Sequence, residues 1–256
     1  MTQRNLDAEH YRNNSKIQLD LAHRAITLYS FAGDESILDV GCGDGRLTAY
    51  LSHKTSAQVV GIDPSRSMIG LAAKSFGKNF YKNLDFRLGA AEECTPDKYD
   101  LVTAFNCLHW VRDIEKSFVS IYNSLNDRGC FLFHTFPKEQ QYFDVFKEVL
   151  MTPRWRVYAN SAMHNYWLSS DEYRRLALDL GFVVIKENIE GSEAIYTTKD
   201  DFINYVRGWL QLYVKLPADA ELSFIEDVAN RASLKHSSGH GGCSIPYMSM
   251  SMLLGK

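Results

Sequence analysis

The chain has 256 residues, of which 45% are hydrophobic, and this is enough to bury one substantial core. Its 28 basic side chains face 31 acidic ones, which gives a formal net charge of -3. A charge so close to neutral excludes a global attraction to nucleic acid or anionic lipid. We therefore expect a small molecule or a protein as partner, no nucleic acid and no membrane.

The first half of the chain alternates helices with short apolar strands. In chain order we expect a helix at 15–29, a strand at 36–40, a helix at 46–54, a strand at 58–63, a helix started by Pro64 and Ser65, strands at 84–90 and 98–111, a helix at 115–126, a turn at 126–129 and a strand at 130–136. This alternation predicts an α/β fold with a doubly wound, mostly parallel sheet that helices cover on both faces.

The second half is less regular. We expect a helix at 139–150, an aromatic cover at 151–167, a capped helix at 169–182, a strand at 182–190, two helices within 199–233 that Pro217 separates, a loop at 236–244 and a last, antiparallel strand at 245–254. These elements bring the predicted sheet to seven strands and leave two helical insertions beside it.

The turn after the first strand reads DVGCGDG and predicts a nucleotide-like ligand. A triphosphate site would need GxxxxGK[ST], but no lysine lies between Gly33 and His53. A dinucleotide site would need GxGxxG, and counting from Gly41 and Gly43 puts Arg46 at the third glycine position. Both of these ligands are therefore disfavoured.

Charge favours a third ligand. Asp39 and Asp44 would repel a pyrophosphate and attract a cationic amino group and a sulfonium, both of which S-adenosylmethionine (SAM) carries. Asp63 lies 22 residues after Gly41, at the end of the next strand, where a carboxylate can accept both ribose hydroxyls. Met68, one turn further on, is predicted to lie against the adenine.

Five segments carry a resemblance: DVGCGDG, GIDPSRSM, RLGAAEE, YDLVTAFNCLHWV and LNDRGCFLF. Together they resemble the class I SAM-dependent methyltransferases. The resemblance implies a Rossmann-like seven-stranded sheet with a reversed last strand and one methyltransferase domain over 1–256, with 138–170 and 199–243 inserted as a lid or substrate-binding part. It implies these cofactor-binding residues: Asp39, Gly41, Gly43, Gly45, Asp63, Pro64, Met68, Ala90, Ala91 and Asn106. Ala90 stands where many members carry an aspartate, so backbone groups of Ala90 or Ala91 would bind the adenine.

The fourth strand ends in FNCLHW, which in this family lies beside the transferred methyl group. CLHWV and the early YRNNSKIQ resemble juvenile hormone acid and trans-aconitate carboxyl O-methyltransferases. In the hormone enzymes a glutamine seven residues after a tyrosine, and the tryptophan of the HW pair, hold the substrate carboxylate. The resemblance assigns those roles here to Gln18 and Trp110.

The chemistry of the reaction agrees with a carboxylate acceptor. A carboxylate, with a solution pKa near 4, needs no general base at neutral pH, and no motif supplies an obvious one. Neutral donors such as the Gln18 amide and the Trp110 indole can orient it, so that catalysis is mostly positioning. His109 is a third donor, or the base if the acceptor is a hydroxyl or an amine.

Four further questions stay open at this point. His134 either lines the pocket or is a packed, hydrogen-bonded histidine, and an aromatic set either walls the cavity or packs an inserted lid: Trp155, Tyr158, Tyr166 and Trp167. An acceptor on an acyl carrier protein, as in malonyl-carrier methyltransferases, would need a basic docking patch, for which the candidates are Arg154, Arg156, Arg174 and Arg175. A binding subunit without turnover is the non-enzymatic alternative.

The cysteines and the start of the chain bear on location. Five cysteines are scattered singly with no CxxC pair, so we expect neither a metal site nor a disulfide framework. The first 18 residues lack an apolar core and a cleavage site, and no apolar run approaches the roughly 20 residues that cross a bilayer. We expect a soluble, cytoplasmic protein.

Overall fold

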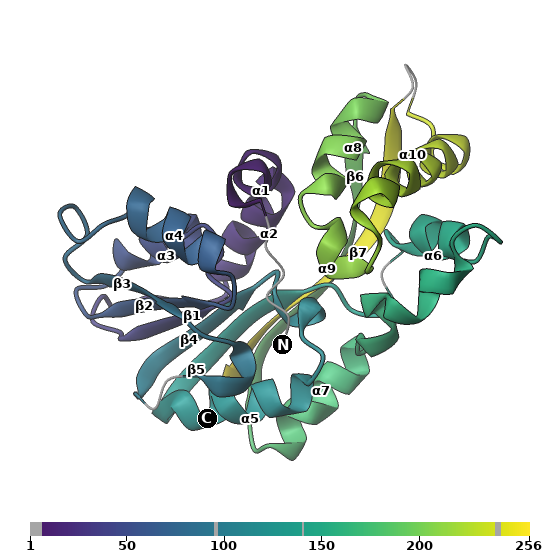
Figure 1. Cartoon of the computed structure of the whole chain (residues 1–256). Helices are drawn as coiled ribbons and strands as arrows, with labels where there is room; N and C mark the ends of the chain where they lie inside the picture. Colours follow the sequence, from purple (N-terminus) through teal and green to yellow (C-terminus); the bar gives the residue numbers. More distant parts are fainter. Residues whose placement is uncertain (1–6, 95–96, 140, 239–241) are drawn as a thin grey trace.

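A seven-stranded sheet forms the centre of the computed structural model, which describes residues 7–94, 97–139, 141–238 and 242–256 (Figure 1). The strands are β1 (Ile37–Val40), β2 (Val59–Asp63), β3 (Leu84–Leu88), β4 (Tyr99–Phe105), β5 (Leu125–Thr135), β6 (Val183–Tyr196) and β7 (Cys243–Gly255). Their order across the sheet is β3-β2-β1-β4-β5-β7-β6. β7 runs antiparallel to both of its neighbours, whereas the pairs from β3 to β5 are parallel. The predicted α/β fold with a reversed last strand is confirmed.

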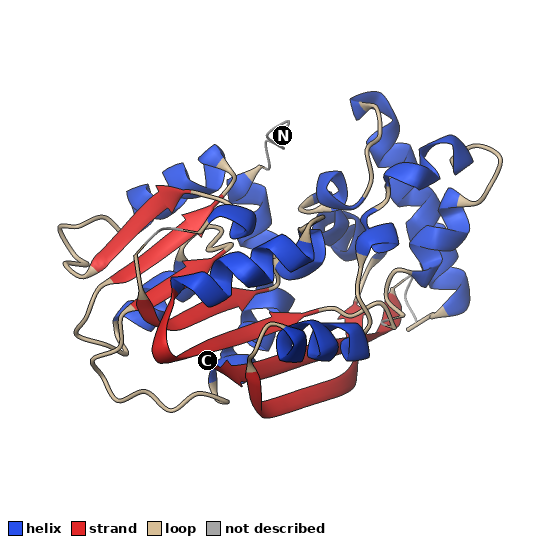
Figure 2. Ribbon diagram, turned by 90° about the horizontal axis from the view of Figure 1, so that it is seen from below, coloured by secondary structure: helices blue, strands red, loops and turns tan. Residues whose placement is uncertain are grey.

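Helices cover both faces of the sheet (Figure 2). They are α1 (Ala8–Asn14), α2 (Lys16–Ile26), α3 (Arg46–Ser52), α4 (Arg66–Ser75), α5 (Ile114–Ser124), α6 (Asp144–Leu150), α7 (Ser170–Asp179), α8 (Lys199–Arg207), α9 (Leu210–Tyr213) and α10 (Ala218–Lys235), with short 3-10 turns η1 (Ala91–Glu93), η2 (Leu108–Trp110), η3 (Arg156–Ser161) and η4 (Met163–Tyr166). α2 and α3 supply the core of one face, and α5 and α7 that of the other. The layers bury the apolar strand residues on both sides, as in other parallel sheets.

The order of the strands fixes the place of a ligand. β1 pairs with β2 on one side and with β4 on the other. The strands that follow β1 are therefore added first on one side of it and then on the other, so the strand order reverses at β1. Ligands of open α/β sheets bind outside the carboxyl ends of the strands at such a switch point. The glycine turn after β1 and the FNCLHW segment after β4 meet there.

Several of the predicted boundaries were wrong. The helix expected at 15–29 is shorter, since it is α2 and ends at Ile26; α1, which was not expected, precedes it and is separated from it by Ser15, whose φ of -106° and ψ of 30° are not helical. The turn expected at 126–129 is a bulge inside β5, since Leu125 pairs with Tyr99 while Cys130 already pairs with Leu101. The helix expected at 139–150 begins at Asp144.

β6 and β7 extend beyond the rest of the sheet. β7 pairs with β5 only from Met250 to Gly255, but with β6 along its whole length from Cys243. The free part of this ribbon carries α8, α9 and α10, which pack with α6 around a separate apolar cluster (Figure 1). We call these four helices and the free ribbon the upper unit. The loop expected at 236–244 lies partly outside the described residues.

Candidate functional site

Three glycines shape the turn between β1 and α3. Gly41, Gly43 and Gly45 have φ of 71°, 54° and 82°, a region that other residues adopt only with strain. A Cβ on Gly41 would come within 2.4 Å of the Cβ of Cys107, so the turn and the end of β4 approach as closely as they can. A Cβ on Gly43 would meet nothing within 4 Å. It would point into a cavity of about 390 Å³ that Gly41, Cys42, Gly43 and Asp44 line.

Asp39 lies below this turn and not at the cavity. Its two carboxylate oxygens accept hydrogen bonds from the hydroxyls of Thr48, at 2.7 Å, and Thr103, at 2.8 Å. The side chain is 2% exposed, and burial raises the pKa of Asp39 to about 6. Asp39 therefore ties β1, β4 and α3 together and lines neither cavity, and its contact with a cofactor stays a prediction.

Asp63 lies at the mouth of the turn. Its carboxylate accepts the backbone N–H of Gly43 at 3.1 Å and of Ser65 at 2.8 Å. Each carboxylate oxygen has further lone pairs, so two hydroxyls of a ligand can still be accepted. Burial raises the pKa of Asp63 to about 6, which the two amide donors partly offset.

The other expected cofactor residues fall into two groups. Met68 is only 2% exposed inside α4, Pro64 is exposed, and neither lines a cavity. Ala90 and Ala91 lie at the start of η1, beyond the carboxyl end of β3, and their backbone oxygens accept from the Glu93 N–H and the Cys94 thiol. Asn106, at the end of β4, lines the cavity and adopts a positive φ of 56°.

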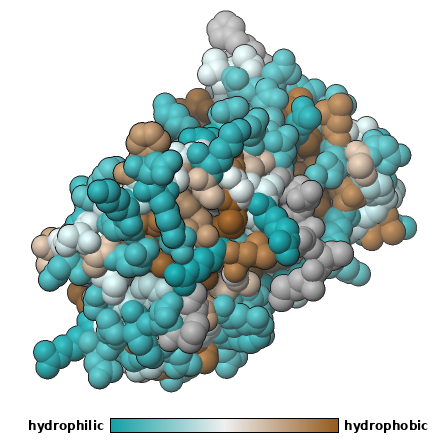
Figure 3. All heavy atoms as spheres, turned by 60° about the vertical axis from the view of Figure 1, so that its left-hand side comes forward, coloured by the Kyte–Doolittle hydropathy of each residue, from teal (hydrophilic) through white to brown (hydrophobic). Residues whose placement is uncertain are grey.

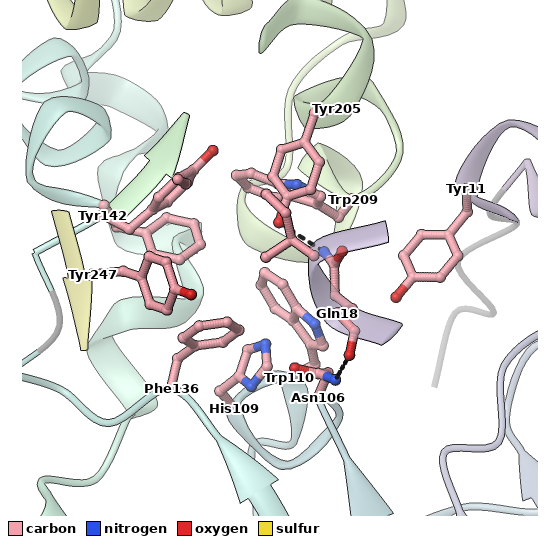
Figure 4. A pocket seen from close by; sticks show the side chains of 13 residues that line it. Tyr11, Gln18, Asn106, His109, Trp110, Phe136, Tyr142, Tyr205, Trp209 and Tyr247 are labelled. Carbon is pink, nitrogen blue, oxygen red and sulfur yellow. Dashed lines mark hydrogen bonds between the residues drawn. The ribbon is translucent and has the colours of Figure 1, made fainter. Parts of the chain in front are cut away.

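A second cavity, of about 500 Å³, adjoins the first and is mostly aromatic (Figure 4). It is lined by Tyr11, Ile17, Gln18, Asn106, His109, Trp110, Phe136, Tyr142, Phe143, Ala194, Tyr205, Trp209 and Tyr247. Among these described residues there is no Lys, Arg, Asp or Glu. We call this second cavity the aromatic cavity and the one at the glycine turn the glycine cavity.

Figure 3 shows hydrophilic side chains around a smaller group of apolar atoms on one face of the molecule.

Tyr11, Gln18 and Asn106 line both cavities and form the wall between them. The Asn106 amide donates to the backbone oxygen of Gln18 at 2.9 Å, which fixes α2 to the end of β4. In Figure 4 the Tyr11 hydroxyl points toward these two side chains. Burial, with the charges of Asp44 and Asp63, raises the pKa of Tyr11 well above its usual value, so it stays a protonated donor.

His109 and Trp110 form the floor of the aromatic cavity. His109 is 3% exposed, its Nδ1 lies 3.2 Å from the Thr135 hydroxyl, and its backbone oxygen accepts from the Trp167 indole. Burial lowers the pKa of His109 to about 3, with a smaller contribution from His134. The imidazole is therefore neutral at physiological pH and a weak proton acceptor.

Gln18 is held from the upper unit. Its Nε2 donates to the Tyr205 hydroxyl at 2.7 Å, and its Oε1 is buried with no hydrogen-bond partner among the described residues. The oxygen and nitrogen ends of a side-chain amide are assigned from their hydrogen-bond partners. Because a tyrosine hydroxyl both donates and accepts, the amide can be turned by 180° without losing this bond.

The aromatic set expected at 155–167 lines neither cavity: Trp155, Tyr158 and Trp167 pack against the upper unit, whereas Tyr166 is exposed and lies beside Arg112. Trp155 is buried and donates to Asp227 at 2.7 Å, and Trp167 is buried against Phe143. The rings that do line the cavity come from other places in the chain, and Tyr205, Trp209 and Tyr247 were not expected. Their only sequence signal was the general aromatic content of the second half.

Two of the four arginines that were candidates for a basic patch form ion pairs: Arg154 with Asp227, and Arg174 with Asp171 and Glu187. Arg156 and Arg175 are exposed.

His134 is 1% exposed and lines neither cavity. Both of its ring nitrogens lack a partner among the described residues, which differs from the hydrogen-bonded packing that we had considered.

With this geometry the chain can be compared with known proteins. Residues 10–187 match the family model of a methyltransferase domain. The chain belongs to this methyltransferase family. It is a SAM-dependent methyltransferase, as the turn and the fold had indicated.

The methyltransferase is similar to the juvenile hormone acid O-methyltransferase of Drosophila melanogaster, at 25% identity over 84% of this chain and 76% of that one. It is also 30% identical to the malonyl-[acyl-carrier protein] O-methyltransferase of Bacillus cytotoxicus, over 52% of this chain and about half of the bacterial protein (47%). A solved structure with the same fold, described as a putative methyltransferase from Bacillus halodurans, superposes with a TM-score of 0.67 at 17% identity, over 93% of this chain and 99% of that one.

The glycine cavity fits SAM. The empty space beside Gly43 would admit the cofactor next to the backbone, and Asp63 would hold its ribose hydroxyls. Asn106 offers a buried, unpartnered Oδ1 that can accept from the amino group. Among the described residues no cluster of His, Cys, Asp and Glu could hold a metal ion, and no described helix is long and apolar enough to span a membrane.

Proposed function

We propose that this methyltransferase transfers the SAM methyl group to the carboxylate of a small organic acid with an apolar body. The observation that carries the proposal is the aromatic cavity, which offers neutral hydrogen-bond donors at its junction with the glycine cavity and no effective base. A hydroxyl or amine acceptor would have to lose a proton. Among the described residues that line this cavity, His109 is the one histidine, and burial lowers its pKa to about 3. A carboxylate is already ionised.

The lining also restricts the rest of the substrate. Its many rings bury apolar surface well, and ligand cavities of this kind use a few polar groups to set orientation. A second carboxylate would find no cation there, and burying an unpaired charge is costly. The cavity therefore favours a monocarboxylic acid over a polycarboxylic acid such as aconitate.

The contribution of the chain to the reaction is orientation. When bound, SAM supplies an electrophilic methyl group. Gln18, Trp110 and Tyr11 hold the carboxylate by neutral donors, which bind the anion more weakly than a guanidinium would and so leave it reactive. The charge on the acid is lost as the ester forms, and the dry aromatic walls favour that loss.

Similarity to the Drosophila enzyme supports a carboxyl acceptor. Similarity to the malonyl-carrier enzyme supports the same chemistry on a carrier-bound acid as the alternative. The pairing of Arg154 and Arg174 with acidic residues argues against an acidic carrier protein docking there.

The test is transfer of labelled methyl from SAM to a panel of apolar monoacids, di- and tricarboxylic acids and malonyl carrier protein, with base-labile product as the readout. Gln18→Ala and Trp110→Phe should each lower ester formation by about tenfold or more, because a hydrogen bond to a charged group contributes about 1.5–3 kcal/mol. SAM affinity is measured separately for each variant.

Matched controls make the same chemical change elsewhere. Trp155→Phe removes an indole donor buried in the upper unit, and Gln58→Ala removes an exposed amide. Both should keep ester formation near that of the parent protein. If the parent protein binds SAM but forms no ester with any acid, the proposed function is wrong.

A further inference from the structure

Three tyrosines in or next to the upper unit lie one after another and lead to Gln18, and we call them the tyrosine chain. Tyr142 precedes α6, Tyr196 ends β6, and Tyr205 lies on α8. The Tyr142 and Tyr196 hydroxyls are 2.8 Å apart, and the rings of Tyr196 and Tyr205 pack together with their centroids 5.4 Å apart. Tyr205 accepts from Gln18 at 2.7 Å, as the dashed line in Figure 4 shows. The chain thus links helices far apart in sequence to one amide.

Burial keeps every hydroxyl in this chain protonated. It raises the pKa of Tyr142, Tyr196 and Tyr205 well above the usual value for tyrosine. Each hydroxyl therefore has one hydrogen to donate and can accept from its neighbour. Since the Gln18–Tyr205 hydrogen bond can run in either direction, the Gln18 amide has two orientations.

The two orientations present different ends of Gln18 to the aromatic cavity. In the first, Gln18 Nε2 donates to Tyr205, and Oε1 is left without a hydrogen-bond partner among the described residues. In the second, the Tyr205 hydroxyl donates to Oε1 of a turned amide. The Nε2 hydrogens then face the cavity.

A bound carboxylate would favour the second orientation of the Gln18 amide. An amide oxygen that faces the cavity would repel an anionic substrate, whereas an NH2 group would donate to it. Both orientations keep the Gln18–Tyr205 hydrogen bond, so the carboxylate adds a hydrogen bond at little internal cost.

We propose that this tyrosine chain positions Gln18, with Tyr205 as the residue that turns its amide donor toward the substrate carboxylate. The inference rests on the proposed function, because it assumes that Gln18 binds a carboxylate. It gives the upper unit a part in recognition beyond enclosing the acid. Tyr205 acts through Gln18 and is a positioning residue.

The test is a double-mutant cycle of Tyr205→Phe and Gln18→Ala, with the best acid of the panel as substrate. Steady-state kinetics give KM and kcat, and tryptophan fluorescence gives acid binding with S-adenosylhomocysteine in place of SAM. Tyr205→Phe alone should raise KM and the acid dissociation constant by about tenfold, with kcat changed by less than about threefold. In the Gln18→Ala background it should change them by less than about twofold.

Tyr213→Phe is the matched control. Tyr213 is a buried tyrosine of the upper unit whose hydroxyl bonds to His164, outside the chain. Its substitution should leave acid binding unchanged.

If Tyr205→Phe acts equally in both backgrounds, or Tyr213→Phe weakens the acid as much, the positioning role is wrong while carboxyl methylation stands. If the parent protein binds none of the acids, both proposals are overturned.

Discussion

Two glycines of the same turn should respond very differently to alanine. Gly41 and Gly43 both have positive φ, which costs a non-glycine residue about 1–2 kcal/mol. At Gly43 the new Cβ meets nothing within 4 Å, so this strain is the main cost to folding. At Gly41 the Cβ would overlap Cys107, at 2.4 Å from its Cβ and 2.8 Å from its Sγ, and overpacking adds about 1–3 kcal/mol.

We therefore expect Gly41→Ala to lower the free energy of unfolding by about 2–5 kcal/mol and Gly43→Ala by about 1–2 kcal/mol. For SAM binding we expect the larger loss of affinity in Gly43→Ala. The Gly43→Ala methyl enters the glycine cavity, and a steric cost of about 1.4 kcal/mol would weaken SAM binding tenfold.

The assays are urea denaturation without cofactor and calorimetric titration with SAM. Gly33→Ala is the matched control, because Gly33 has a φ of 102° and equally open space around its Cβ but lies before β1, away from both cavities. If Gly43→Ala bound SAM as tightly as Gly33→Ala, the cofactor would not approach the turn as inferred. If Gly41→Ala were as stable as Gly33→Ala, the packing argument would fail.

Three further predictions concern ionisation. The pKa of Asp39 is raised to about 6 in the folded protein, above its ordinary value of 3.8, so its contribution to stability is complete below about pH 4 and is lost as pH rises to about 6. Urea denaturation from pH 4 to 7 should show this fall in the parent protein and a smaller slope in Asp39→Asn; an unchanged slope would contradict it. The pKa of Asp63 is also about 6, so SAM affinity by calorimetry should weaken as pH falls from 7 to 5, whereas Asp63→Asn should bind weakly at every pH. With a pKa of about 3, His109 is not expected to act as base: kcat of His109→Asn on the best acid should stay within about threefold of the parent, and a loss of about a hundredfold or more would restore the base role.

The cofactor half of the fold could be predicted because its signals are local. Strands of four to seven apolar residues, a turn with three glycines, and Asp63 at the end of the next strand each depend on a few neighbouring residues. Where the pattern misled us, the cause was a competing local feature. At Leu125 the chain bulges within β5, which looks in the sequence like a simple turn.

The aromatic cavity was only partly predictable because its walls come from distant segments. Gln18, His109 and Trp110 were expected from motifs, and all three line it. Tyr205 and Trp209 meet them only because the β6–β7 ribbon carries α8 and α9 over the sheet, and no spacing along the chain encodes that contact. Asp39 is a motif residue whose scaffold role was not predicted, because its partners Thr48 and Thr103 come from α3 and β4.

The β6–β7 ribbon has a consequence for how such an enzyme can diversify. The matched family region ends at residue 187, before the free part of the ribbon. Four of the residues that line the aromatic cavity lie beyond it: Ala194, Tyr205, Trp209 and Tyr247. The segment leaves the sheet on one strand and returns on its neighbour, so recombination at two adjacent points would graft a new acceptor pocket onto an unchanged cofactor module. Chimaeras that exchange residues 188–249 between relatives are thus a direct route to new acceptors.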